Sequence, residues 1–113
     1  MGKLRVLIVD DSKISRVMIA EHLRETDFEV CGMAADAVEA LKLYEELRPD
    51  FVTMDMNLPD TNGLECSRRI LALDADARIL MISAMKDASL MTQGREVGIH
   101  AFLQKPVKPN EIV

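Results

Sequence analysis

The sequence predicts an α/β fold with a parallel β-sheet, and three observations support this prediction. Short apolar runs alternate along the chain with longer stretches whose apolar residues recur at helical spacing, which is the pattern of βαβ units. The apolar runs are nearly continuous, as expected of strands buried on both faces. The chain has 113 residues, the length of one ordinary domain, so residues 1–113 are expected to fold as a single unit.

The first βα unit begins with the apolar run Leu4–Val9, which is rich in β-branched residues and is followed by two aspartates. A helix is predicted from Ser12 to about Thr26, with Asp11 or Ser12 as its N-cap. Its apolar residues recur at helical spacing and are Ile14, Val17, Met18 and Leu23.

The second unit begins with the predicted strand Phe28–Met33. Asp36 then caps a helix that must end before Pro49, because the residue preceding a proline avoids the helical region. The predicted inner face of this helix consists of Val38, Leu41, Tyr44 and Leu47.

The rest of the chain repeats this alternation, with a loop at residues 58–63. Each crossover between parallel strands should be right-handed. The remaining predicted strands are Asp50–Asp55, Arg78–Ser83 and Ala101–Gln104, and the remaining predicted helices are Leu64–Leu73 and Asp87–Val97.

Composition excludes several classes of function. Lys and Arg number 14 and Asp and Glu number 19, a net charge of −5, which argues against direct nucleic-acid binding. No apolar run approaches the ~18 residues of a membrane span, and the N-terminus has no signal-peptide pattern. Cys31 and Cys66 lie in no CxxC motif, which disfavours a disulfide scaffold or a structural zinc site. We therefore expect a cytoplasmic protein with no membrane partner.

Polar side chains follow four of the five predicted strands. Asp10 and Asp11 follow the first strand, Asp55 ends the third, Ser83 ends the fourth and Lys105 follows the fifth. Each has an ordinary structural explanation when taken alone, as a helix cap, a turn residue or a surface lysine. Because the carboxyl ends of parallel strands meet at one edge of the sheet, we expect these side chains to lie close together.

Three carboxylates in one cleft repel one another and need a cation. An all-oxygen ligand set with room for water favours Mg²⁺. A divalent ion beside a carboxylate suits phosphoryl chemistry, in which the carboxylate attacks phosphorus to give an acyl phosphate. The ammonium of Lys105 and the hydroxyl of Ser83 could bind the remaining phosphoryl oxygens.

These motifs resemble those of two-component response-regulator receiver domains. The resemblance covers the whole chain and rests on V-D-D-S at residues 9–12, M-D-M-N-L-P-D-T-N-G at 54–63, I-S-A at 82–84 and K-P at 105–106. It implies a flavodoxin-like, doubly wound sheet with strand order 2-1-3-4-5, the order known for the chemotaxis regulators of this family. It also implies a phospho-switch, driven by a sensor histidine kinase and acting on a downstream target or output domain.

The resemblance assigns a role to each residue of the motifs. Asp55 corresponds to the phosphoacceptor, and Asp10 with Asp11 corresponds to the acidic pair that holds Mg²⁺. The backbone carbonyl of Asn57 would complete the metal ligands contributed by the protein.

Three further residues correspond to the switch. Ser83 matches the hydroxyl residue that follows the phosphoryl group inward, and Lys105 matches the lysine that binds it. Phe102 matches the switch aromatic, although an aromatic residue in a short strand is as well explained as plain core.

Two other functions compete with this interpretation. One is a degenerate receiver-like interaction module that takes no phosphoryl group, although such copies usually lose a member of the residue set and none is lost here. The other is a phosphatase of the haloacid dehalogenase type, which generally needs an acidic residue two positions after its nucleophile, where this chain has Asn57.

The last residues predict an incomplete fifth helix. Pro109 and Glu111 read as a helix start, but only Ile112 and Val113 remain, which allows about one turn. Because a parallel sheet must be covered on both faces, an apolar strip beside the first helix would then be exposed. We expect the sequence to be the N-terminal part of a longer protein, or, if it is stable as it stands, to self-associate, for example as a homodimer.

Overall fold

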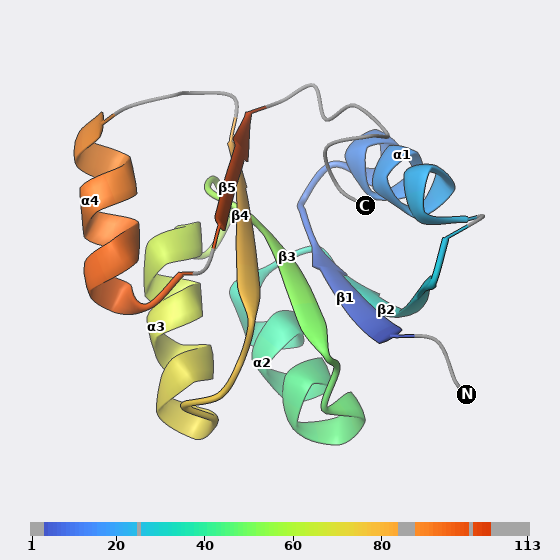
Figure 1. The fold of residues 1–113 in the computed structure, drawn as a ribbon, viewed down its shortest axis with the longest axis horizontal. Coiled ribbons are helices and arrows are strands. Elements are labelled where there is room, and N and C mark those ends of the chain that lie inside the picture. The colour runs from blue at the N-terminus through green and yellow to red at the C-terminus, as the bar shows by residue number, and fades with distance from the viewer. Residues whose placement is uncertain (1–3, 25, 84–87, 100, 105–113) are drawn as a thin grey trace.

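The computed structural model describes residues 4–24, 26–83, 88–99 and 101–104. It is a five-stranded parallel sheet in the order β2-β1-β3-β4-β5, flanked by helices (Figure 1). The strands are β1 Leu4–Val9, β2 Phe28–Ala34, β3 Phe51–Asp55, β4 Ile79–Ser83 and β5 Ala101–Gln104. The helices are α1 Lys13–Leu23, α2 Ala37–Leu47, α3 Gly63–Leu73 and α4 Ala88–Val97.

The predicted fold class and strand order are confirmed, and most element boundaries lie within one residue of the prediction. The largest difference is at α1, which ends at Leu23 rather than near Thr26. Of the two candidate caps for this helix, Ser12 is the one used, and its side chain accepts a hydrogen bond from the backbone N–H of Ser15 (3.3 Å).

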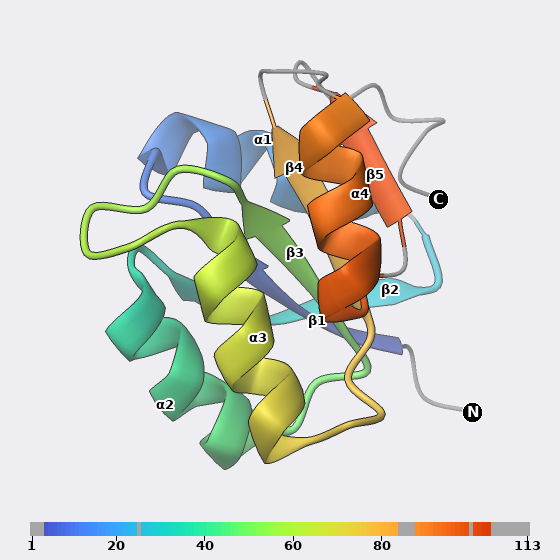
Figure 2. The same ribbon diagram turned by 90° about the vertical axis from the view of Figure 1, so that its left-hand side faces the viewer.

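The helices cover the two faces of the sheet unequally. Figure 2 shows α2, α3 and α4 side by side on one face, with α1 on the other. Successive strand residues point to opposite faces. Leu7 and Val9 accordingly belong to the core beneath α2 and α3, whereas Val6 and Ile8 pack with α1. Every helix runs back antiparallel to the strands, so the loops that follow the strands gather at one edge.

The apolar residues that recur at helical spacing in α1 are mostly exposed. Ile14 is 73% exposed, and Val17 and Met18 are also exposed, whereas Ile19 and Leu23 are buried against the sheet. The buried side of this helix is set by where it meets β1 and β2. Helical spacing alone cannot distinguish that side from a second apolar stripe on the same helix.

The predicted inner face of α2 is wrong at Val38, which is 69% exposed. The buried face is centred on Ala37, Ala40 and Tyr44, and Leu41 packs against the same core. The small alanines allow the helix backbone to approach the sheet closely, so the contact follows them rather than the bulkier valine.

Lys105 and the predicted fifth helix lie outside the described residues. In the part of the chain that the structure describes, no helix combines the length and the hydropathy that crossing a bilayer requires.

Candidate functional site

The register of the strands brings the predicted site residues to one level. Val9 pairs with Met54, so Asp10 and Asp55 follow at equal height on neighbouring strands β1 and β3. Asp55 in turn pairs with Ile82 on β4, and Ser83 is the next residue along. Three neighbouring strands at the centre of the sheet therefore end in polar groups at the same edge, as predicted from the sequence.

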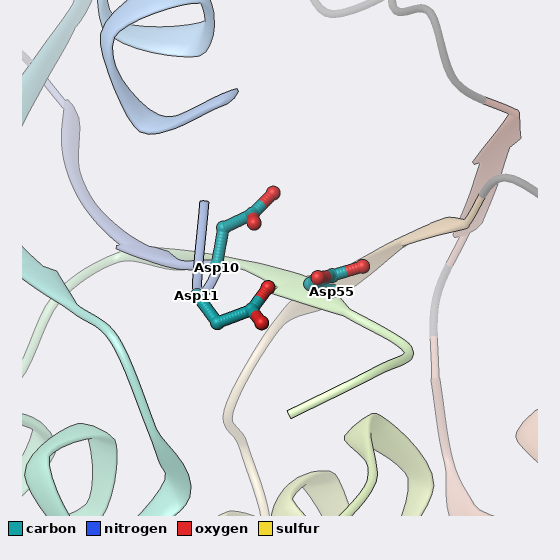
Figure 3. A group of neighbouring side chains, drawn as sticks. All are labelled: Asp10, Asp11 and Asp55. Carbon is teal, nitrogen blue, oxygen red and sulfur yellow. The ribbon is translucent and has the colours of Figure 1, made fainter. Parts of the chain in front are cut away.

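Asp10, Asp11 and Asp55 form a compact cluster in which each contributes one carboxylate oxygen, and these oxygens all lie within 4.8 Å of one another. Figure 3 shows the three carboxylates gathered around one space, with Asp11 pointing toward Asp55. Asp10 and Asp55 are buried, whereas Asp11 is exposed. The cluster thus has a buried floor and a solvent-facing side from which a ligand can enter.

The backbone around Asp10 is held from several directions. Its N–H donates to the carbonyl of Ala34 (3.0 Å), which extends the pairing of β1 with β2. Its side chain accepts from the N–H of Ser12 (2.9 Å), and the guanidinium of Arg16 donates to its carbonyl oxygen (2.6 Å). These bonds fix the turn between β1 and α1, and with it the direction of the carboxylate.

The electrostatics of the cluster favour a cation. Two unit charges 4 Å apart repel by about 4 kcal/mol at an effective dielectric constant of about 20. An all-carboxylate oxygen set, partly open to water, is the environment that Mg²⁺ prefers, because Mg²⁺ keeps several water ligands. The residues present therefore fit a magnesium ion.

The loop between β3 and α3 is folded tightly against the cluster. Asn57 is exposed and pairs with Asn62 in an antiparallel bridge, while the N–H of Gly63 donates to the carbonyl of Met56 (2.7 Å). A Cβ on residue 63 would lie 2.3 Å from the carbonyl oxygen of Asp55, so only glycine fits at this point. The loop that carries Asn57 thus returns directly past Asp55.

The other predicted residues lie on β4 and β5. Ser83 is buried at the end of β4 and pairs in register with Gln104, whose successor Lys105 is outside the described residues. Phe102 packs against the core under α4. A Cβ on Gly94 of α4 would lie 2.1 Å from Cζ of Phe102, so the phenyl ring occupies a notch that this glycine leaves.

Sequence reasoning missed Asp60, Arg16 and Gly94. Each acts through a partner in another element, and no local pattern identifies that partner. Asp60 accepts hydrogen bonds from backbone N–H groups of α2 that precede it by 22 and 23 residues. A glycine within a predicted helix was the one available signal, since it often marks a close approach.

Comparison with known proteins gives one family. The model of the response regulator receiver domain matches residues 6–113. The chain is 41% identical over 109 residues to Protein CcdB of Bacillus subtilis, covering 96% of this chain and 91% of that protein. It is 38% identical over 113 residues to the chemotaxis protein CheY of Thermotoga maritima, covering 100% and 93%.

A solved structure agrees with the sequence relatives. The CheX-CheY-BeF3-Mg²⁺ complex from Borrelia burgdorferi superposes with a TM-score of 0.95 at 30% identity, covering 98% of this chain and 84% of that chain.

Proposed function

Because this chain belongs to the response regulator receiver domains, the phosphoacceptor signalling modules of two-component systems, we propose that Asp55 takes the phosphoryl group. The observation that carries the proposal is the three-carboxylate cluster, which joins Asp55 to Asp10 and Asp11 at one strand edge. The donor would be a phosphohistidine on a sensor kinase.

In the proposed reaction, a carboxylate oxygen of Asp55 forms a bond to phosphorus. The bond from phosphorus to the histidine nitrogen breaks at the same time, and the imidazole keeps its electron pair. Asp55 ends one strand at the floor of the cluster, where a donor entering from the exposed Asp11 side would reach it.

The proposed metal ligands are the carboxylates of Asp10, Asp11 and Asp55 and the backbone carbonyl of Asn57. When bound, Mg²⁺ would neutralise charge on the phosphoryl oxygens and align the phosphoryl group. The protein's own contribution is to hold these oxygens in place, through the bonds around Asp10 and the tight β3–α3 loop.

We propose that Ser83 and Lys105 receive the remaining phosphoryl oxygens. Ser83 lies on the strand next to Asp55, one residue beyond the register partner of Asp55, which supports a role for its hydroxyl near the phosphoryl group. Lys105 directly follows β5, the strand that pairs with Ser83. Their movement would reach Phe102 and the surface of α4 and β5, a two-state change biased by one local charge.

The partners of the switch follow from the family. We propose a cytoplasmic histidine kinase as donor, and a target protein or output domain at the α4–β5 surface. The relative from Borrelia burgdorferi was solved in a complex with CheX, BeF3 and Mg²⁺, which supports both a protein partner and the metal. Residues 1–113 would act as one receiver unit.

Membership in the receiver-domain family excludes the phosphatase alternative. One experiment distinguishes the proposed phosphoacceptor from the remaining alternative, a receiver-like interaction module that takes no phosphoryl group. The protein is incubated with acetyl phosphate and Mg²⁺, and its intact mass is measured. We expect the native chain and an Asp27→Asn control, which alters an exposed aspartate outside the cluster, to gain one phosphoryl group. Asp55→Ala should gain none. If the native chain gains nothing, the domain is a receiver-like module; if Asp55→Ala still gains, the acceptor is another residue.

A further inference from the structure

The side chain of Asp60 joins two elements on either side of the candidate site. Asp60 belongs to the loop between β3 and α3, and its carboxylate reaches the first turn of α2. Oδ1 accepts from the N–H of Ala37 (2.9 Å), and Oδ2 accepts from the N–H of Val38 (3.1 Å). Figure 2 shows this loop passing close to the start of α2.

These two bonds fill positions that α2 cannot fill by itself. The first N–H groups of any helix have no partner within the helix. The helix's own cap, Asp36, accepts from the N–H of Glu39 (2.8 Å), and Asp60 takes the two N–H groups before it. The hydrogen bonds from Ala37 and Val38 hold the pKa of the Asp60 carboxyl below its usual range.

The loop is therefore fixed both at its base and at its tip. At the base, Gly63 bonds to Met56, and Asn57 pairs with Asn62. Asn62 is itself held, because its side chain accepts from the N–H of Glu65 at the start of α3 (2.9 Å). At the tip, Asp60 joins the loop to α2 through its two hydrogen bonds.

We propose that Asp60 is a positioning residue for the metal. By fixing the β3–α3 loop, Asp60 holds the backbone carbonyl of Asn57 in position to bind the metal together with the carboxylate cluster. This inference rests on the proposed function. A metal ligand on a loop that must first be ordered binds more weakly, because ordering the loop consumes part of the binding free energy. The two hydrogen bonds between Asp60 and α2 order the loop before the metal binds.

The test is a calorimetric titration of the metal-free full chain with Mg²⁺, without any phosphoryl donor. Asp60→Ala removes both acceptors, and Asp60→Asn keeps one. We expect the Mg²⁺ dissociation constant to rise roughly tenfold in Asp60→Ala, at the lower end of the ~10–100-fold range for groups that orient metal ligands. Asp60→Asn should fall between this variant and the native chain.

Asp36→Ala is the matched control, because it also removes a cap from the start of α2 but leaves the loop contact in place. We expect it to lower the melting temperature while leaving Mg²⁺ affinity within about twofold of native. If Asp36→Ala weakens Mg²⁺ binding as much as Asp60→Ala does, or if neither variant weakens it, the proposed positioning role is wrong. A native chain that binds no Mg²⁺ would instead overturn the proposed metal site itself.

Amide hydrogen exchange gives a second readout that stands apart from the metal. In Asp60→Ala, exchange at Ala37, Val38 and Gly63, whose N–H donates to Met56 at the base of the loop, should accelerate together if the loop and the helix start form one unit. Faster exchange at Ala37 and Val38 alone, with Gly63 unchanged, would show that Asp60 caps the helix without holding the loop, and would overturn the proposal.

Discussion

The carboxylates at the amino ends of the strands and those at the carboxyl ends have different surroundings. At the amino edge, Asp74 accepts a hydrogen bond from the hydroxyl of Tyr44 (2.8 Å) and lies 3.8 Å from the guanidinium of Arg48. Asp50 there accepts from the backbone N–H of Arg5 (2.7 Å). At the carboxyl edge, Asp10, Asp11 and Asp55 instead face one another.

The difference separates a structural network from a functional site. Carboxylates that have donors and cations beside them stabilise the fold without any ligand, and they connect α2 to α3 and β1 to the β3 start. Carboxylates that converge repel one another even where a donor such as the N–H of Ser12 is present, and a bound cation would lower that repulsion. A protein retains such an arrangement where the cation is part of its activity.

The largest expected effect tests whether the amino edge serves stability alone. Tyr44 is 1% exposed, and Tyr44→Ala should lower the free energy of unfolding by about 3–5 kcal/mol, as for other buried aromatic residues. Urea unfolding in EDTA measures it. Val38→Ala, an exposed position on the same helix, should change it by less than about 0.5 kcal/mol. A loss of Mg²⁺ affinity in folded Tyr44→Ala would show that the two edges are not separate.

A smaller effect of opposite sign is expected at the carboxyl edge. Asp11→Asn removes one of three like charges from an exposed position, so the metal-free protein should gain about 1 kcal/mol of unfolding free energy. Asp27→Asn makes the same change in net charge away from the cluster and should have little effect. Urea unfolding in EDTA at low salt compares them. A less stable Asp11→Asn would mean that the cluster is not repulsive.

The smallest effect concerns the pH dependence of the amino edge. The hydrogen bond from Tyr44 lowers the pKa of Asp74, so its stabilising contribution is present above about pH 4 and is lost as pH falls through the lowered pKa. Burial and the Asp74 bond raise the pKa of Tyr44, so its contribution is present below about pH 10 and is lost as pH rises further. Tyr44→Phe should weaken both dependences in unfolding curves. Unchanged curves would refute this coupling.

Features that depend on neighbouring residues in the chain or on strand ends could be predicted from the sequence. Strand ends in a parallel sheet meet at one edge, so Asp10, Asp11 and Asp55 could be grouped from their positions in the sequence alone. The buried sides of α1 and α2 could be predicted only in part, since Leu23 and Tyr44 are buried, whereas Ile14 and Val38 satisfy helical spacing and yet face outward. The contact made by Asp60 could not be predicted either, because its donors lie in α2 and only the folded chain brings them to the β3–α3 loop.

The central claim is that the carboxyl-edge cluster is a cation site, and its most direct test is the free energy of unfolding in Mg²⁺ and in EDTA at equal ionic strength. A ligand present at about 100 times its dissociation constant stabilises the native state by about 2.7 kcal/mol. We predict an increase of this order for the native chain, and a much smaller one for Asp11→Asn. Equal unfolding free energies of the native chain in Mg²⁺ and in EDTA would contradict the claim.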